Sequence, residues 1–234
     1  MSLTREGIAY RVAQDLPEGA YVNLGIGIPS LVGRFLPADK EIFLHSENGL
    51  LGFRSADHDE RDPHLVNANK DPVVLLPGAA VFDHAWSFTM IRGGHLTHTV
   101  LGALEVAANG DLANWRVSAQ QVPGVGGAMD LAAGVRNVWV AMTHVTPQGR
   151  PKIVERCHFP LTAPRCVKRI YTDLAVIDVT PEGLVLREVC PGMTPQAVQE
   201  LTGAPLTVAS DCRTMTLPQE FEGLALVAEG GPAA

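Results

Sequence analysis

The sequence predicts an α/β fold, with a mostly parallel sheet and helices on both faces. Short apolar runs typical of buried strands recur along the chain and alternate with helical and loop segments. No change in composition marks a linker and no internal repeat is present, so we expect residues 1–234 to form one domain. We expect the polar tail, about residues 225–234, to be frayed. Near the end of the chain, apolar runs on either side of a Pro-Glu-Gly turn predict a C-terminal β-hairpin.

The predicted helices have start and stop signals that can be read from side chains. Thr4 is placed to cap a first helix, in which Ile8, Val12 and Leu16 recur at four-residue spacing and which ends at residues 17–19. Further helices are expected at residues 30–35, 85–91, 131–133 and, after a cap at Thr194, through Leu201.

The predicted strands are short apolar runs, each bounded by turn-forming residues. They are residues 21–24, 41–45, 73–76, 99–104, 138–142 and the two hairpin arms 174–179 and 184–189. The run at 73–76 reads as a buried strand that Pro77-Gly78 closes. The polar stretch 53–71 predicts a long surface loop, and long loops in compact domains often carry function.

Composition and charge exclude several classes of protein. Hydrophobic residues make up 46% of the chain and charged residues 18%, which is enough for a core and too few charges for a disordered chain. The formal net charge of −7 argues against nucleic-acid binding. No segment has the roughly 18 uninterrupted apolar residues of a membrane span. Residues 1–15 carry charges throughout and lack the apolar region of a signal peptide, so we expect a cytoplasmic protein.

The cysteines and histidines do not predict a metal site. The four cysteines form no C-x-x-C pair and are expected to be reduced, mostly buried thiols. His95 and His98 form an H-x-x-H pair without a nearby cysteine or carboxylate, so we interpret them as ordinary polar side chains. We therefore expect no bound metal.

Glu47 is a candidate for covalent chemistry because of its position just past a predicted strand. Ligands bind at the carboxyl ends of strands in open α/β sheets, and the glycines at 49 and 52 would allow a substrate to approach. Carboxylates are known nucleophiles. A glutamate at a helix N-terminus, or one in a salt bridge, would satisfy the same residues, and sequence physics alone leaves that alternative open.

Two polar or glycine-rich segments are candidate binding sites. Residues 124–130 (GVGGAMD) offer consecutive backbone N–H groups leading into a helix, which suits an anion or oxyanion site but also an ordinary glycine turn. The segment lacks the register of a dinucleotide-binding fingerprint. Asn23, at a predicted strand end, has two open roles: it could donate to a ligand carbonyl, or it could cap the turn that follows.

Several motifs together resemble the beta subunits of 3-oxoacid CoA-transferases. Residues 23–29 (NLGIGIP) and 45–52 (HSENGLLG) are similar to two signatures of that family, and the resemblance extends from about residue 3 to residue 208. Further similar segments are residues 76–79, 90–95, 110–115, 126–131, 160–162 and 169–175.

The resemblance implies a CoA-transferase-like α/β fold and a ping-pong reaction. The family's S-E-N-G glutamate is the nucleophile, which corresponds to Glu47 and implies a glutamyl–CoA thioester intermediate. It implies oxyanion and CoA contacts at Gly126, Gly127 and Ala128. Expected substrate-binding residues are Asn23, Gly25, Gly27 and Asn48. No cofactor is expected to stay bound, because the CoA thioester is itself the substrate. An alpha subunit is the implied partner, in a heterotetramer.

The expected substrates are succinyl-CoA as donor and a 3-oxoacid as acceptor. Segments 16–19, 36–39, 169–175 and 177–181 are most similar to the 3-oxoadipate CoA-transferases of aromatic catabolism, although acetoacetate-using relatives share much of them. The chain departs from the family pattern at residues 53–56, Pro123 and Asn69. These departures surround the expected substrate mouth and bear on the acceptor. An acyl-CoA hydrolase and a non-catalytic sensor of sugar phosphates or other metabolites are the competing readings of the same fold.

Overall fold

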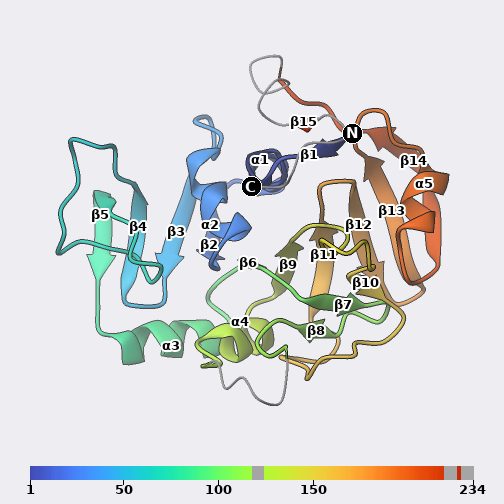
Figure 1. Ribbon diagram of the computed structural model, residues 1–234. Coiled ribbons are helices and arrows are strands. Elements are labelled where there is room, and N and C mark those ends of the chain that lie inside the picture. Colours follow the sequence, from blue (N-terminus) through green and yellow to red (C-terminus); the bar gives the residue numbers. More distant parts are fainter. Residues whose placement is uncertain (118–123, 219–225, 228–234) are drawn as a thin grey trace.

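A single large sheet organises the computed structural model, which describes residues 1–117, 124–218 and 226–227 (Figure 1). In spatial order its ten strands are β14 (Leu206–Thr214), β13 (Gly183–Val189), β12 (Ala175–Thr180), β11 (Val167–Tyr171), β9 (Asn137–Ala141), β6 (His98–Leu101), β2 (Ala20–Leu24), β3 (Ile42–Ser46), β4 (Leu50–Ser55) and β5 (Val73–Val81). The central run from β11 to β3 is parallel throughout. Antiparallel pairs flank it on both sides, and β14 joins β13 in parallel. The predicted α/β class with a mostly parallel sheet is confirmed.

Helices cover both faces of the sheet, as the sequence predicts. On one face lie α1 (Arg5–Asp15), α2 (Ile28–Leu31) and the 3₁₀ turn η1 (Val32–Arg34). The other face carries α3 (His84–Arg92), α4 (Ala128–Gly134) and α5 (Pro195–Glu200), together with a small sheet of β10 (Ile153–Val154), β7 (Glu105–Ala107) and β8 (Leu112–Ala113). Successive side chains of the central strands feed the two cores in turn: Val100 and Trp139 belong to the first, whereas Leu101 and Val140 belong to the second. No helix of the described chain is both long and apolar enough to cross a membrane.

The capped helices form where their signals lie. The Thr4 hydroxyl accepts a hydrogen bond from the Gly7 N–H at 3.1 Å, and Ile8, Val12 and Leu16 are buried against the sheet. Thr194 caps α5 in the same way, through the Ala197 N–H. The hairpin of β12 and β13 also forms as expected.

The structure corrects the prediction for the segment after residue 72. The sequence predicts a buried strand at residues 73–76 that Pro77-Gly78 ends, but β5 continues through both residues to Val81. It is the edge strand of the sheet, largely exposed from Leu76 onward. A proline, which has no N–H to donate, is tolerated on an edge, so the Pro-Gly pair does not end the strand.

Other boundaries shift for local reasons. The predicted loop 53–71 begins later, because its first residues complete β4 through Ser55. The expected helix 30–35 is a single α-helical turn from Ile28 that tightens into η1, and the strand predicted at 99–104 ends at Leu101. Within the expected frayed tail, residues 226–227 form β15 and pair with β1 (Ser2–Leu3). The rest of that tail lies outside the described residues.

A buried ion pair joins α1 to the far part of the sheet. Arg11 donates through Nε and Nη2 to the two carboxylate oxygens of Glu188 on β13, at 2.6 and 2.9 Å. The two residues are only 8% and 4% exposed. Burial alone would raise the pKa of Glu188, but the hydrogen bonds from Arg11 and Arg213 bring that pKa below its ordinary value.

We predict that Glu188→Gln lowers the free energy of unfolding by about 3 kcal/mol, because it leaves the Arg11 guanidinium buried without its counter-charge. Urea denaturation followed by circular dichroism measures this loss. The stabilisation from Glu188 is present above its unfolded-state pKa and is lost as pH falls through the lower folded-state pKa, so the variant should differ less from wild type in acid. Glu60→Gln, in the exposed pair with Arg54, is the matched control and should change stability little. Equal losses in the two variants would contradict a special role of the buried pair.

Candidate active site

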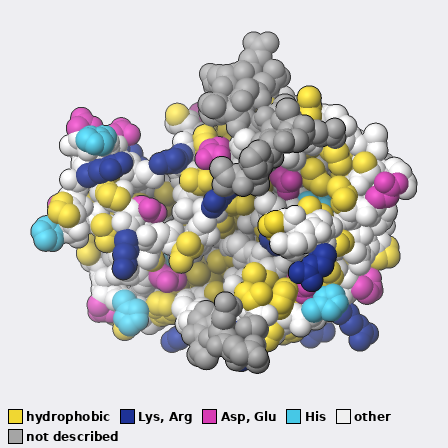
Figure 2. All heavy atoms as spheres, viewed as in Figure 1, with side chains coloured by type: hydrophobic (Ala, Val, Ile, Leu, Met, Phe, Trp, Pro, Cys, Tyr) yellow, Lys and Arg dark blue, Asp and Glu magenta, His cyan; other side chains and the backbone are white. Residues whose placement is uncertain are grey.

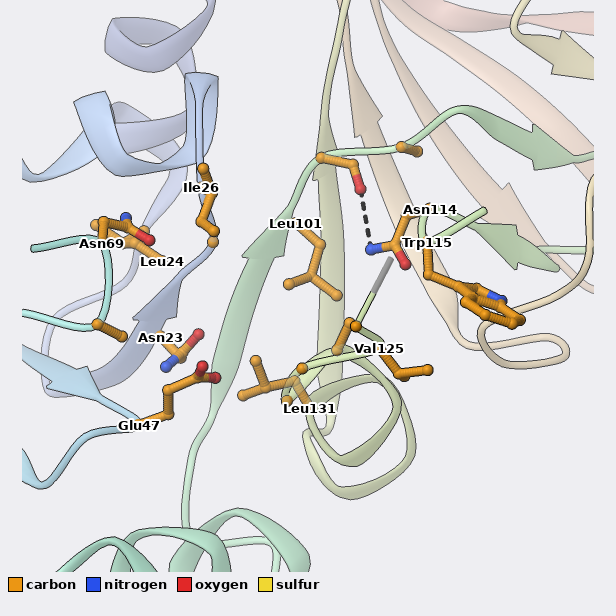
Figure 3. A pocket seen from close by; sticks show the side chains of 18 of the residues that line it. Asn23, Leu24, Ile26, Glu47, Asn69, Leu101, Asn114, Trp115, Val125 and Leu131 are labelled. Carbon is orange, nitrogen blue, oxygen red and sulfur yellow. Dashed lines mark hydrogen bonds between the residues drawn. The ribbon is translucent and has the colours of Figure 1, made fainter. Parts of the chain in front are cut away.

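A pocket opens at the carboxyl ends of three parallel strands. β2 lies between β3 and β6, so the chain leaves it toward opposite sides of the sheet. Such divergence leaves a crevice at the strand ends where ligands bind. The cavity measures about 480 Å³ and is lined by the ends of β2 and β3, by residues 101–104 after β6, by residues 114–115 and by the glycine segment before α4 (Figure 3).

Glu47 reaches this pocket from a tight turn between β3 and β4. The Gly49 N–H donates to the Ser46 carbonyl at 2.9 Å, which closes the turn. Gly49 has a φ of +111°, and a Cβ there would overlap the carbonyl oxygen of Phe82. Glycine is therefore required at this position, and the turn projects the half-buried Glu47 side chain into the cavity (Figure 3).

The glycine segment lies directly against the Glu47 carboxylate. A Cβ built on Gly127 would overlap Glu47 Oε2 and would stand 3.1 Å from the ring of Phe88. α4 begins at Ala128, so the N–H groups of its first turn, which have no partner within the helix, lie beside this carboxylate. The structure thus brings together Glu47, Gly126, Gly127 and Ala128, which are separated by some eighty residues in the chain.

Burial and a neighbouring charge destabilise the ionised form of Glu47. Burial is the main reason that its pKa is raised above the ordinary value, and the carboxylate of Asp130 raises it further. His84 acts in the opposite direction. Asp130 itself is held by Arg92, whose Nε donates to Asp130 Oδ1 at 2.7 Å. A carboxylate that is poorly solvated and close to another negative charge is a more reactive nucleophile than one in water.

Asn23 occupies the wall of the pocket and is almost fully buried. Its side-chain nitrogen lies 3.3 Å from Nδ1 and 3.4 Å from the carbonyl oxygen of His45, which is its partner in the β2–β3 register. His45 in turn contacts the Ser87 hydroxyl through Nε2, at 3.0 Å. The amide group of Asn23 is therefore held in one orientation from the interior of the sheet.

The other expected binding residues separate into two groups. Gly25 lines the pocket, but its N–H donates to the Val100 carbonyl at 2.9 Å, so it offers space rather than a donor. Gly27 lies at the start of α2, outside the lining of this cavity. Asn48 is exposed and donates to the Val66 carbonyl at 2.8 Å, which ties the loop after β4 to the turn. The structure therefore gives Asn48 and Gly27 local structural roles.

Sequence reasoning assigned no role to several residues at the site. His84 and Asp130 affect the Glu47 carboxylate, and Asn114 and Trp115 form the far wall. Asn114 belongs to a segment that carries the family resemblance, but its contact with the Gly102 carbonyl, at 3.2 Å, joins two strand ends. Such contacts arise only when the chain folds, so no local pattern could have indicated them.

The described residues contain no cluster of three or more potential metal ligands. His98 packs edge-on against Trp139, with ring centroids 4.7 Å apart, and contacts the Thr97 hydroxyl through Nδ1. All four cysteines are unpaired; Cys190 is buried and the other three are half-buried.

Comparison with known proteins gives a consistent result. The family model described as coenzyme A transferase matches residues 5–201. The beta subunit of the 3-oxoadipate CoA-transferase of Acinetobacter baylyi is 55% identical over 210 residues, which are 89% of this chain and 97% of that protein. Its counterpart from Pseudomonas putida is 56% identical, over 87% of this chain and 96% of that protein. The acetate CoA-transferase subunit beta of Escherichia coli is 46% identical, over 90% and 96%.

Solved structures share the fold at low sequence identity. An acyl-CoA transferase apoenzyme of Escherichia coli O157:H7 superposes with a TM-score of 0.72 at 21% identity, covering 91% of this chain. This chain spans only 43% of that longer polypeptide. The decarboxylase AibA/AibB matches with a TM-score of 0.67 at 17% identity, over 92% of this chain and 89% of that one. Since proteins with different named activities share this fold, these structures indicate architecture only.

We predict that Asp130→Asn lowers the pKa of Glu47 toward the ordinary glutamate value, because it removes the nearby negative charge and leaves only burial to raise that pKa. Carbon-detected NMR titration of the glutamate carboxyl groups measures the change, with Glu47→Gln used to assign the signal. Asp39→Asn, an exposed carboxylate at the opposite end of β3, is the control and should leave the titration unchanged. A Glu47 titration that is the same in wild type and Asp130→Asn would contradict the electrostatic coupling.

Proposed function

The chain belongs to the coenzyme A transferase family, and we propose that it is the nucleophile-bearing subunit of an enzyme that transfers CoA from succinyl-CoA to 3-oxoadipate. The observation that carries this proposal is Glu47. Its carboxylate projects into a cavity at the carboxyl edge of the sheet, is poorly solvated, and faces the N-terminus of α4. This is the environment that covalent catalysis by a carboxylate requires.

The first half of the proposed reaction loads CoA onto the enzyme. A Glu47 carboxylate oxygen attacks the thioester carbon of succinyl-CoA, and the carbon–sulfur bond breaks to give a mixed anhydride and CoA thiolate. The thiolate then attacks the Glu47 carbonyl carbon of that anhydride. Succinate leaves as a carboxylate, and a glutamyl–CoA thioester remains on the protein.

The second half repeats these steps in reverse with the acceptor. The carboxylate of 3-oxoadipate attacks the glutamyl thioester, which gives a new anhydride and CoA thiolate. Attack of the thiolate on the acceptor's carbonyl carbon forms 3-oxoadipyl-CoA and restores the Glu47 carboxylate. No net proton transfer or redox change is needed, which accords with a pocket whose described lining has no titratable side chain besides Glu47.

Backbone groups beside Glu47 are the proposed source of oxyanion stabilisation. Each step passes through a tetrahedral centre with a negatively charged oxygen. The N–H groups of Gly127 and Ala128 lie at the start of α4, close to where that oxygen would form. A donor of this kind is worth roughly 3 kcal/mol of barrier in enzymes where it has been removed.

The choice of 3-oxoadipate rests on the relatives. The two beta subunits named for 3-oxoadipate CoA-transferase are 55% and 56% identical to this chain. By comparison, the human succinyl-CoA:3-ketoacid coenzyme A transferase 2 is 45% identical, over 41% of its own length. Acetoacetate is the alternative acceptor. Asn69, one of the departures from the family pattern, lines the pocket and so contributes to the surface against which the acceptor is selected.

A second subunit is part of this proposal. Relatives that match this chain over nearly their full length are named as subunits, and longer relatives extend well beyond the part that this chain matches. The pocket is incomplete by itself: Ile26, in its wall, is 78% exposed. Figure 2 shows this face hollowed, with hydrophobic side chains around the hollow. We propose that an alpha subunit covers this face and contributes to holding the strongly anionic CoA, which a chain of net charge −7 is poorly suited to hold alone.

We predict that Glu47→Ala and Glu47→Gln abolish CoA transfer in the reconstituted two-subunit enzyme, because no other group can carry the covalent intermediate. Turnover of succinyl-CoA with 3-oxoadipate measures this, and mass spectrometry of the wild-type enzyme after succinyl-CoA alone should place a hydroxylamine-sensitive CoA adduct on the peptide containing Glu47. Glu41→Gln, an exposed glutamate just before the same strand, is the matched control and should keep full activity.

The same experiment separates the alternative functions. An acyl-CoA hydrolase would form the adduct but release CoA without an acceptor acid, whereas a metabolite sensor would form no adduct. Retention of more than a few per cent of wild-type turnover in Glu47→Gln would refute the role of Glu47 as nucleophile.

We predict that this polypeptide purified alone is folded but essentially inactive, because its pocket lacks the covering subunit. Adding the alpha subunit should restore transfer, and light scattering should show a hetero-oligomer form at the same stoichiometry at which activity saturates. Full succinyl-CoA-dependent activity from this chain alone would mean that CoA is held entirely within its 234 residues, contrary to the proposal.

A further inference from the structure

The orientation of the Asn23 amide is determined by its neighbour on β3. Asn23 and His45 are paired in the parallel register, and the Asn23 side-chain nitrogen faces both Nδ1 and the backbone carbonyl oxygen of His45. A carbonyl oxygen can only accept a hydrogen bond, so the NH₂ end of the amide must lie on this side. The other end, Oδ1, consequently turns toward the cavity, on the side of the Glu47 carboxylate (Figure 3).

The same contacts select one tautomer of His45. Because Nδ1 faces the amide NH₂ of Asn23, it must accept, so the ring proton resides on Nε2 and is donated to the Ser87 hydroxyl at 3.0 Å. His45 is 2% exposed and Ser87 is fully buried. Burial lowers the pKa of His45 to about 4, which keeps the ring neutral at physiological pH. Ser87, His45 and Asn23 therefore form a fixed chain of hydrogen bonds that runs from α3 through the sheet to the pocket.

We propose that His45 and Ser87 are positioning residues that hold Asn23 Oδ1 as a hydrogen-bond acceptor for the amide N–H of a CoA thioester. This inference rests on the proposed function. The thioester carbonyl and the carboxylates of the substrates only accept hydrogen bonds, so an acceptor in the wall has no favourable contact with them. The donor nearest to the reacting carbon of an acyl-CoA is the cysteamine amide N–H, two methylene groups from the sulfur.

This assignment differs from the role expected of Asn23 from the sequence. There, an asparagine at a strand end is expected either to donate to a ligand carbonyl or to cap a turn. Its donor end is instead directed to His45, and the stabilisation of the reacting carbonyl is left to the N–H groups at the start of α4. Asn23 then recognises the CoA arm, and Gly127 and Ala128 face the chemistry.

The test compares two small thioesters in the reconstituted enzyme. One is the succinyl thioester of N-acetylcysteamine, which has the amide N–H. The other is the succinyl thioester of 2-mercaptoethyl acetate, in which an ester oxygen replaces that N–H. Wild type should prefer the amide compound in kcat/KM by at least roughly fivefold, the typical effect of one neutral hydrogen bond.

The variants then identify which residues produce that preference. Asn23→Leu removes the acceptor, and His45→Phe keeps a ring in the core but removes both of its hydrogen bonds, so both should lose most of the preference. In His45→Gln, the amide oxygen can accept from Asn23 while its NH₂ donates to Ser87, so the preference should be largely restored. Ser87→Ala should give an intermediate value.

His144→Phe is the matched control. His144 is also a fully buried histidine, with each ring nitrogen 2.9 Å from a threonine hydroxyl, and burial lowers its pKa to about 4 as well. This substitution should reduce stability as His45→Phe does but leave the preference between the two thioesters unchanged. A purely structural role of His45 would give the same result for both substitutions.

The outcomes separate this inference from the proposed function. If wild type transfers CoA but uses both thioesters equally, the acceptor role of Asn23 is wrong; if the preference survives in His45→Phe, the positioning role is wrong. If wild type transfers no CoA, the proposed function fails, and the tautomer still tests the hydrogen-bond chain. Long-range proton–nitrogen NMR of the isolated protein should show His45 protonated at Nε2 alone, and a proton on Nδ1 would overturn the arrangement.

Discussion

The parallel arrangement of β2, β3 and β6 is the constraint from which the site follows. Parallel strands end at the same edge of a sheet, so side chains that follow each of them are gathered there whatever their separation in the sequence. Asn23, Glu47 and residues 101–104 reach one cavity for this reason. The crossover connections that parallel strands require then supply its remaining wall, because α3 and α4 pack on the face beside the strand ends. The contact of Gly127 with the Glu47 carboxylate depends on that packing.

The features that the sequence predicts well are those determined by neighbours in the chain. Thr4 and Thr194 mark their helices because a cap acts over three residues, and the β12–β13 hairpin follows from one turn between two apolar runs. Glu47 and the glycine segment were predicted from their position next to strands and glycines, reinforced by the family resemblance. The β5 prediction was wrong because an apolar run has the same composition in the centre and at the edge of a sheet.

The remaining features of the site depend on contacts across the fold. The direction of the Asn23 amide is determined by a side chain on the neighbouring strand, and the effect of Asp130 on Glu47 crosses from α4 to the β3–β4 turn. Asn48, by contrast, belongs to a motif that resembles the family signature but turns outward to a loop carbonyl. In the C-terminal half, Arg169 and Arg187 both donate to Asp178, which commits these cations to holding strands together.

The Pro-Gly pair within β5 has a consequence for how this protein behaves at high concentration. An edge strand presents unpaired backbone groups, and a long, regular edge invites other chains to add to the sheet. At Pro77 the edge lacks an N–H, and Gly78, with a φ of +86°, departs from regular strand geometry. The sheet therefore has a natural terminus on this side, and the molecule can display an open hydrophobic hollow to a specific subunit without offering an equally accessible template for fibrous aggregation.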